Sequence, residues 1–145
     1  MDERRVKSCV WIARLLIAAV TFLNVQAAFQ FMLRPQDYAW GFELTGVPGE
    51  AMLQGLGLLF LMWNVPYAFA LASPIKNFIS LISAVIMQFI GFSGESLILL
   101  RLTGEHPLIT SSVTRFIIFD GAGLLALLLA LGLAVSVKSA EAKKA

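Results

Sequence analysis

The sequence predicts an all-α fold, an antiparallel bundle of four helices that crosses a membrane. Hydrophobic residues make up 59% of the 145 residues and charged residues 14%, whereas a soluble domain is about 45–50% apolar and about 25% charged. The apolar excess lies in four stretches, residues 10–33, 51–72, 78–100 and 116–137. Each has roughly the 20 residues with which a helix crosses about 30 Å of hydrocarbon. We therefore expect a single four-span membrane domain over residues 1–145.

Residues 10–33 are expected to form the first span. A cleaved signal peptide is the alternative, because basic residues precede the apolar stretch and Val25-Gln26-Ala27 resembles a cleavage site. Arg14 would interrupt the apolar core of such a peptide, and this favours a retained helix.

The stretch RPQDYAWGFELTGVPGE, residues 34–50, is expected to be the first outer loop. Irregular backbone cannot face lipid, where its amides lack partners, but it can lie at the membrane surface. The aromatic residues Tyr38, Trp40 and Phe42 suit the headgroup layer, and the glycines and prolines supply turns. We expect turns with a short helix or a strand pair, and Trp40 at headgroup depth.

Residues 51–72 and 78–100 are expected to form the second and third spans. Pro66 lacks an N–H and crowds the preceding turn, which predicts a kink near Met62 to Asn64. The side chain of Asn64 could then bond a backbone group that the kink frees. The connection at residues 73–77 is so short that these two spans must be antiparallel neighbours.

The fourth span, residues 116–137, follows a longer outer loop, residues 101–115. A Thr110-Ser111-Ser112 cluster in that loop is expected to cap the helix. Small residues recur in the span at every fourth position: Ala122, Ala126, Ala130 and Ala134. Small side chains let another backbone approach closely. We interpret this face as packing against the first span, with an interface to another membrane subunit as the alternative.

The basic residues predict the orientation. Eight of the 11 Lys and Arg residues lie on the side that holds both termini, and the positive-inside rule assigns this side to the cytoplasm. These eight are Arg4, Arg5, Lys7, Arg14, Lys76, Lys138, Lys143 and Lys144. We expect a bacterial-type plasma membrane, with both termini cytoplasmic. The basic ends therefore indicate topology and contact with membrane lipids, and no nucleic-acid partner is expected.

Polar residues in the outer half predict a pocket at the extracytoplasmic mouth of the bundle. The expected lining residues are Gln54, Gln88, Glu95 and Asp120, with Arg101 and Arg115 above them. Gln88 and Glu95 lie only about 20° apart on a helical wheel, and an ionisable group inside a membrane normally faces protein or water. Such a pocket could hold a lipid headgroup, a quinone ring or a cation.

The alternative interpretation of these residues involves no ligand. Glu95 would pair with Arg101 or Arg115, and Asp120 would stabilise the start of the fourth span as an acid near a helix N-terminus. The first span also limits the pocket, because Thr21 and Asn24 are expected to point away from Gln26 and Gln30. Not all of these polar groups are therefore expected to line one cavity.

Catalytic and metal motifs are not apparent in the sequence. His106 is the single histidine and Cys9 the single cysteine, whereas a metal site needs several ligands and a dithiol redox site needs two cysteines. We therefore expect no catalytic residue, no metal and no resident cofactor, while a quinone or a lipid remains a conceivable occupant of the pocket.

The first half of the chain resembles the DoxX-like family of small four-helix membrane proteins. The resembling residues are Arg14-Leu15-Leu16, then LRPQDYAWGFELTGVPG from Leu33, then LQGLGLLFLMWNVPY from Leu53. The resemblance implies a four-helix architecture, and some relatives serve as membrane subunits of quinone-linked oxidoreductases. This chain departs from the family pattern at Gln54 and Asn64, where an acidic residue is usual, and at Gln30, where a lysine is usual.

The predicted function is that of a small non-catalytic membrane protein, either an accessory subunit or a lipid-binding module. The first alternative is the membrane subunit of a quinone-linked oxidoreductase, with Glu95 and Asp120 near the ring. The second is an oligomeric transporter or channel, although the spans show no row of charges that would form a path.

Overall fold

The computed structural model describes residues 1–102 and 104–143, and all regular structure in these residues is helical. The elements are α1 (Glu3–Leu33), α2 (Gln36–Ala39), the 3₁₀ helix η1 (Trp40–Phe42), α3 (Gly46–Trp63), α4 (Val65–Ala72), α5 (Phe78–Arg101) and α6 (Pro107–Ala142). The all-α prediction is confirmed. Lys144, one of the basic residues used to predict orientation, and Thr103 in the predicted second loop lie outside the described residues.

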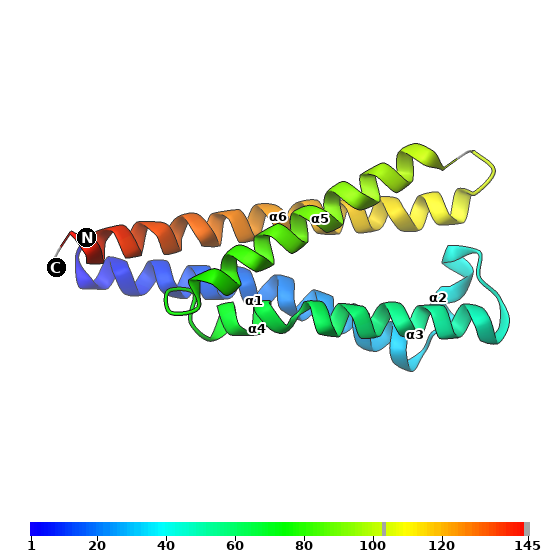
Figure 1. The fold of residues 1–145 in the computed structure, drawn as a ribbon, viewed down its shortest axis with the longest axis horizontal. Coiled ribbons are helices and arrows are strands. Elements are labelled where there is room, and N and C mark those ends of the chain that lie inside the picture. Colours follow the sequence, from blue (N-terminus) through cyan, green and yellow to red (C-terminus); the bar gives the residue numbers. More distant parts are fainter. Residues whose placement is uncertain (103, 144–145) are drawn as a thin grey trace.

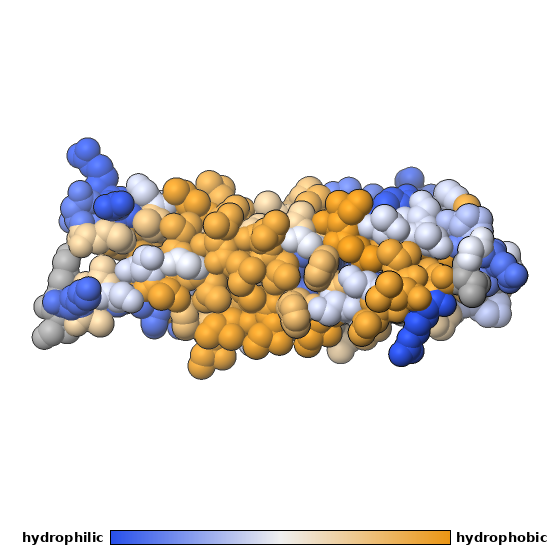
Figure 2. Space-filling model, turned by 90° about the horizontal axis from the view of Figure 1, so that it is seen from above, coloured by the Kyte–Doolittle hydropathy of each residue, from blue (hydrophilic) through white to orange (hydrophobic). Residues whose placement is uncertain are grey.

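Four of these helical segments are long and apolar enough to cross a membrane. They are Glu3–Leu33, Gly46–Ala72, Phe78–Arg101 and Pro107–Ala142. Apolar residues gather along the middle of the molecule and hydrophilic residues at its two ends, as Figure 2 shows. This distribution matches a protein whose middle lies in hydrocarbon and whose ends lie in water.

The helices extend beyond the predicted spans, most of all in α6. This helix begins at Pro107, inside the predicted loop 101–115. Proline suits a first helical position, because its fixed φ is already helical and its missing N–H is not needed there. The Thr110-Ser111-Ser112 cluster therefore lies within the helix and does not cap it. The Thr110 hydroxyl instead donates to the His106 carbonyl at 2.8 Å, which is a bond typical of threonine inside a helix.

The predicted kink in the second span is a break at Asn64, between α3 and α4. Pro66 cannot donate to the ladder, so the turn before it loses a hydrogen bond. The Asn64 side-chain amide donates to the Phe60 carbonyl at 2.7 Å, but this carbonyl also accepts from the Asn64 backbone N–H at 3.1 Å, so it is not a group that the proline frees. The break allows α4 to run in a direction different from that of α3.

Both termini lie at one end of the molecule, which we call the termini end, and α2, η1 and the α5–α6 connection lie at the other, the loop end (Figure 1). Helix α6 packs along α1 and α5, and α3 packs on α1. Helix α4 packs on α5, whereas α3 hardly touches it. Figure 1 shows that α5 diverges from α3 toward the loop end.

The main core lies in the half of the molecule near the termini. Its buried residues come from four helices: Ala13, Ile17, Val20, Tyr67, Ala70, Leu81, Ala84, Leu127, Ala130 and Ala134. Two members of the alanine face, Ala130 and Ala134, are therefore packed within the molecule, while Ala122 is exposed. The first loop folds as α2 and η1, so it takes the helical form of the two that the sequence allowed.

Candidate functional site

A cavity of about 280 Å³ lies in the half of the molecule near the loop end. All four long helical segments contribute side chains to its wall. Because α3 and α5 separate toward the loop end, the side of the cavity between them is the one that no packed helix pair closes. This opening would face the hydrocarbon if the four segments cross a membrane.

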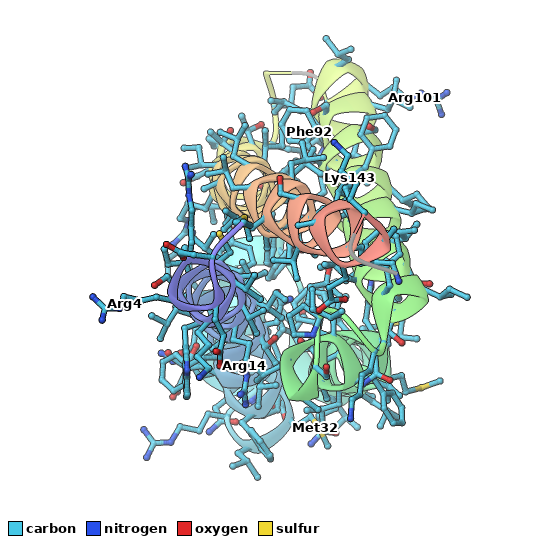
Figure 3. All side chains as sticks on the ribbon, turned by 90° about the vertical axis from the view of Figure 1, so that its left-hand side faces the viewer. Arg4, Arg14, Met32, Phe92, Arg101 and Lys143 are labelled. Atoms are coloured by element: carbon cyan, nitrogen blue, oxygen red, sulfur yellow. The ribbon has the colours of Figure 1, made fainter. Side chains whose placement is uncertain are left out.

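Four of the six predicted site residues line this cavity. They are Gln88, Glu95, Asp120 and Arg115. Gln54 does not, since it lies about 240° around the helix from Phe60, which faces the cavity. Its side chain is exposed and donates to the Met32 carbonyl of α1 at 3.4 Å. Arg101 does not line the cavity either, since it projects outward from the end of α5, as Figure 3 shows.

A hydrogen-bonded chain of polar side chains forms the floor of the cavity. The Tyr67 hydroxyl of α4 lies 2.7 Å from Gln88 Oε1 and 3.1 Å from the Ala84 carbonyl. Gln88 Nε2 donates to Asp120 Oδ1 of α6 at 2.8 Å. Gln88 is 3% exposed, so its amide orientation is fixed by partners on both sides. The chain joins α4, α5 and α6 at the boundary between core and cavity.

Two glycines make room for this contact between α5 and α6. A Cβ at Gly91 would collide with Asp120 Oδ2, and a Cβ at Gly123 would lie 2.7 Å from Gln88 Nε2. Each glycine is three residues after the polar residue of its own helix, in Gln88-Phe-Ile-Gly91 and Asp120-Gly-Ala-Gly123. Sequence reasoning missed this pairing, although the repeated spacing of a polar residue and a glycine was a signal for it.

Three buried side-chain atoms have no hydrogen-bond partner among the described residues, and the residues that carry them all line this cavity. They are Trp63 Nε1, Asn64 Oδ1 and Glu95 Oε2. Buried polar atoms are nearly always paired in folded proteins, and in hydrocarbon an unpaired one costs on the order of several kcal/mol. The residues that line the cavity thus include one unpaired donor, one unpaired neutral acceptor and one unpaired carboxyl oxygen.

The two contacts that the ligand-free interpretation expects of the acids are not formed in the described residues. The ion pairs of the described residues are Lys7–Glu3 at 2.8 Å and His106–Glu43 at 2.7 Å, and neither involves Glu95. Asp120 lies several turns inside α6, because that helix begins at Pro107. It therefore does not stabilise the helix start.

Helix α1 contributes more polar groups than the sequence suggested. Thr21 bonds within its own helix, to the Ile17 carbonyl at 2.8 Å, but Asn24, Gln26 and Gln30 all line the cavity. The expectation that these polar groups would not all share one cavity is therefore wrong for Asn24, while Thr21 stays outside the cavity as expected. The cavity covers a broad face of α1, because the divergence of α5 leaves that face uncovered.

Aromatic residues close the cavity toward the loop end. Phe60 and Phe116 line it, and Phe31 packs against both, with ring centroids 6.0 and 6.3 Å apart. Phe42 of η1 packs on Phe116 at 6.0 Å. The Phe42 side chain thereby packs the first loop against the end of the helices.

Two polar contacts hold the first loop in this position. The Ser112 hydroxyl donates to the Gly41 carbonyl at 2.6 Å in a buried setting. Glu43, whose backbone has a left-handed φ of 56°, places its carboxylate 2.7 Å from His106 Nδ1. An L residue rarely adopts this φ, so the loop conformation is held by its contacts.

No group of three or more His, Cys, Asp or Glu residues suited to hold a metal ion occurs in residues 1–102 and 104–143. The polar groups of the side chains that line the cavity are amides, an indole, a phenol, a guanidinium and two carboxyl groups. These groups suit the recognition of a polar organic group.

Comparison with protein-family models, with curated proteins and with solved structures finds no match for this chain. The resemblance to the DoxX-like family therefore stays an expectation from the sequence. Any statement on function has to come from the cavity itself.

Proposed function

We propose that this protein is a non-catalytic integral membrane protein that binds the polar head of an amphipathic membrane molecule in the cavity. One observation carries the proposal: Trp63 Nε1, Asn64 Oδ1 and Glu95 Oε2 are buried without partners among the described residues, and all three residues line one cavity. Four apolar helices support the membrane location. In hydrocarbon, only water or a polar ligand can satisfy such atoms.

The shape of the site favours an amphipathic occupant over a water-soluble one. The cavity is closed toward the loop end by Phe31, Phe42 and Phe116, whereas α3 and α5 lie apart. A molecule with a polar head and an apolar tail fits this arrangement, with its head in the cavity and its tail between the two helices. The outward residues of both helices are apolar and suit contact with acyl chains: Leu58, Leu59, Met62, Phe89, Ile90 and Leu97.

The proposal includes the placement of the chain in the membrane. The four segments form an antiparallel bundle with both termini in the cytoplasm, and the cavity lies in the extracytoplasmic half. The distribution of Lys and Arg supports this orientation. A reporter fused after Ala145 would then be cytoplasmic, and a periplasmic or extracellular signal would contradict the orientation.

The experiment is a census of the molecules that stay bound when the protein is purified in native membrane patches. Ala27 is half-buried on α1 and lines the cavity, so Ala27→Phe should fill part of it. Ala19 is exposed on the same helix, so Ala19→Phe is the matched control. Mass spectrometry should find about one retained amphiphile per parent chain, which Ala27→Phe loses and Ala19→Phe keeps.

Two results would contradict the proposal. One is the recovery of a parent chain that holds no amphiphile beyond the bulk membrane composition. The other is equal retention of the amphiphile by the Ala27→Phe and Ala19→Phe variants. An amphiphile that stays bound when the cavity is filled would be bound on the outer surface. A thermal unfolding scan of each variant confirms that it is folded before the comparison is made.

The membrane subunit of a quinone-linked oxidoreductase is the second candidate function. Aromatic rings from two helices, α3 and α6, line the cavity together with Glu95 and Asp120: Phe60, Trp63, Phe116 and Phe119. A flat quinone ring would stack on such side chains. The same mass analysis separates the two candidates, since a quinone is identified by its mass and its redox absorbance. A protein recovered in constant proportion would instead indicate an accessory subunit.

A further inference from the structure

The charges around the cavity do not balance. Glu95 and Asp120 both line it, and Arg115 is the only basic residue that does so among the described residues. Arg115 is not paired with either acid, because no ion pair of the described chain involves them. Its guanidinium lies 3.3 Å from the Ser112 hydroxyl. A carboxyl group in such a place needs a proton or a cation to offset the cost of burying its charge.

The unpaired atoms specify how an occupant would bond. Asn64 Oδ1 and Glu95 Oε2 are acceptors, so they need N–H or O–H groups from the ligand. Trp63 Nε1 is a donor, so it needs an oxygen. Arg115 is a donor as well, and a guanidinium binds phosphate oxygens in a two-pronged geometry. The cavity thus offers acceptors for a donating cation and donors for an anion.

The aromatic walls favour an organic cation over a metal ion. Phe60, Trp63, Phe116 and Phe119 line the cavity beside the two acids, and the faces of aromatic rings attract ammonium groups. A hard metal ion takes six or more oxygen ligands, and the described residues bring no cluster of three acidic or histidine side chains together.

We infer that the cavity is a binding site for the headgroup of an aminophospholipid. Its primary ammonium group would donate to Asn64 Oδ1 and Glu95 Oε2 beside Asp120, and its phosphate would accept from Trp63 Nε1 and Arg115. The inference rests on the proposed function and adds the class of ligand. A headgroup with both charges places its ammonium beside the two acids and its phosphate beside Arg115, so each charge lies next to one of opposite sign.

Other headgroups match the cavity less well. A choline headgroup has no N–H, so it would leave Asn64 and Glu95 unpaired. A glycerol headgroup has no positive charge to place beside the two carboxyl groups, so its phosphate would add an uncompensated negative charge to the cavity. A quinone ring carries no cationic group, so it would leave the two acids without a positive charge beside them. Each of these is an outcome of the test below.

The test measures which lipid the cavity prefers. The parent protein is placed in nanodiscs with equal amounts of phosphatidylethanolamine, phosphatidylcholine and phosphatidylglycerol of matched acyl chains, and the bound lipid is identified by native mass spectrometry. Hydrogen bonds to a charged group are worth enough to give roughly a tenfold preference. We therefore expect phosphatidylethanolamine to be bound roughly tenfold over the other two.

A pair of variants links this preference to the proposed contact. Glu95→Gln keeps the size of the side chain and removes its charge, so it should keep lipid in the cavity and lose most of the preference for the ethanolamine headgroup. Glu105→Gln is the matched control, because Glu105 is exposed outside the cavity. A further arm adds soluble O-phosphoethanolamine, which should displace little lipid because it lacks the acyl chains that lie between α3 and α5.

The outcomes separate this inference from the proposed function. Equal binding of the three lipids, a preference for phosphatidylglycerol, or an unchanged preference in Glu95→Gln would overturn the ammonium site while lipid binding stands. If soluble O-phosphoethanolamine displaced the lipid at an equal concentration, the site would bind a free phosphoethanolamine, and the inference that its ligand is a lipid would be wrong. A lipid signal that Ala27→Phe leaves intact would instead overturn the proposed function. The lipid competition needs only the parent chain, so it decides even if a variant fails to fold.

Discussion

The two halves of the molecule use the same helices in opposite ways. Near the termini, α4 lies on α5 and the core is filled by Ala, Ile, Leu and one Tyr. Near the loops, α3 stays on α1 and hardly touches α5, and a cavity with amides, acids and aromatic rings takes the place of a core. The difference shows that one span can close the packing at one end and leave it open at the other.

The break at Asn64 marks the change between the halves. It separates α3 from α4. Trp63, just before the break, lines the cavity, and Tyr67, about one turn after it, contributes its hydroxyl to the cavity floor. The break lets α4 pack on α5 while α3 stays on α1. The proline at position 66 thus shapes the site without touching a ligand.

The largest expected effect is in the half near the termini. Leu81 is fully buried in the core, so Leu81→Ala should lower the free energy of unfolding by roughly 2–5 kcal/mol, from lost contacts and the void left behind. Leu97 is 58% exposed on the same helix, and Leu97→Ala should cost much less. Unfolding in mixed detergent micelles measures both. Equal losses would mean that the two halves are packed alike.

The next largest effect is at the boundary between the halves. Gln88 Nε2 donates to Asp120 Oδ1, and hydrogen bonds to charged groups contribute about 1.5–3 kcal/mol. A double-mutant cycle with Gln88→Leu and Asp120→Ala should give a coupling free energy of about that size. The cycle is its own control, because it removes the effects of each single change. A coupling near zero would mean that the chain from Tyr67 to Asp120 does not stabilise the boundary.

A glycine pair on α3 tests whether the half near the loops is open on every side. A Cβ at Gly57 would lie 2.7 Å from the Ala28 carbonyl of α1, so Gly57→Ala should cost about 1–3 kcal/mol as the helices move apart. Gly55 has nothing within 4 Å of such a Cβ, so Gly55→Ala should be neutral or stabilise by up to about 1 kcal/mol. Thermal unfolding compares them. If Gly57→Ala left the unfolding temperature unchanged, α1 and α3 would be as loosely packed as α3 and α5.

The smallest effect belongs to the polar contact that helps hold the first loop. The His106 side chain is 47% exposed and lies 2.7 Å from Glu43, and exposed pairs contribute about 1 kcal/mol or less. His106→Ala should therefore change stability by no more than that. Hydrogen exchange of residues 40–44 should rise in this variant and stay at the parent level in Glu105→Ala. Unchanged exchange in both would mean that the aromatic contacts of Phe42 alone seat the loop.

The membrane character and the helix positions were predictable from the sequence, because hydropathy over about 20 residues is a strong signal. The break near Asn64 was predictable too, since proline acts locally. The boundary of α6 was missed, because the polar residues Thr110 and Ser112 resemble a cap in sequence although their hydroxyls are satisfied within the helix and by Gly41.

The site was predictable only in part. Glu95 and Gln88 share a face of one helix, and a helical wheel finds that directly. The places of Gln54 and Arg101 depend on how α3 and α5 are rotated against their neighbours, which side-chain spacing within one helix does not reveal. Asn24 joins the cavity for the same kind of reason, because the divergence of α5 from α3 widens it.

The most direct test of the account locates the bound molecule. A phospholipid with a photoreactive group next to its headgroup is added to the protein in nanodiscs, illuminated, and mapped by peptide mass spectrometry. Attachment is expected at residues 60–67 and 87–95, where α3, α4 and α5 line the cavity. Attachment there should disappear in Ala27→Phe and persist in Ala19→Phe. Attachment confined to outward residues such as Leu97 and Leu125, unchanged by either variant, would contradict the account.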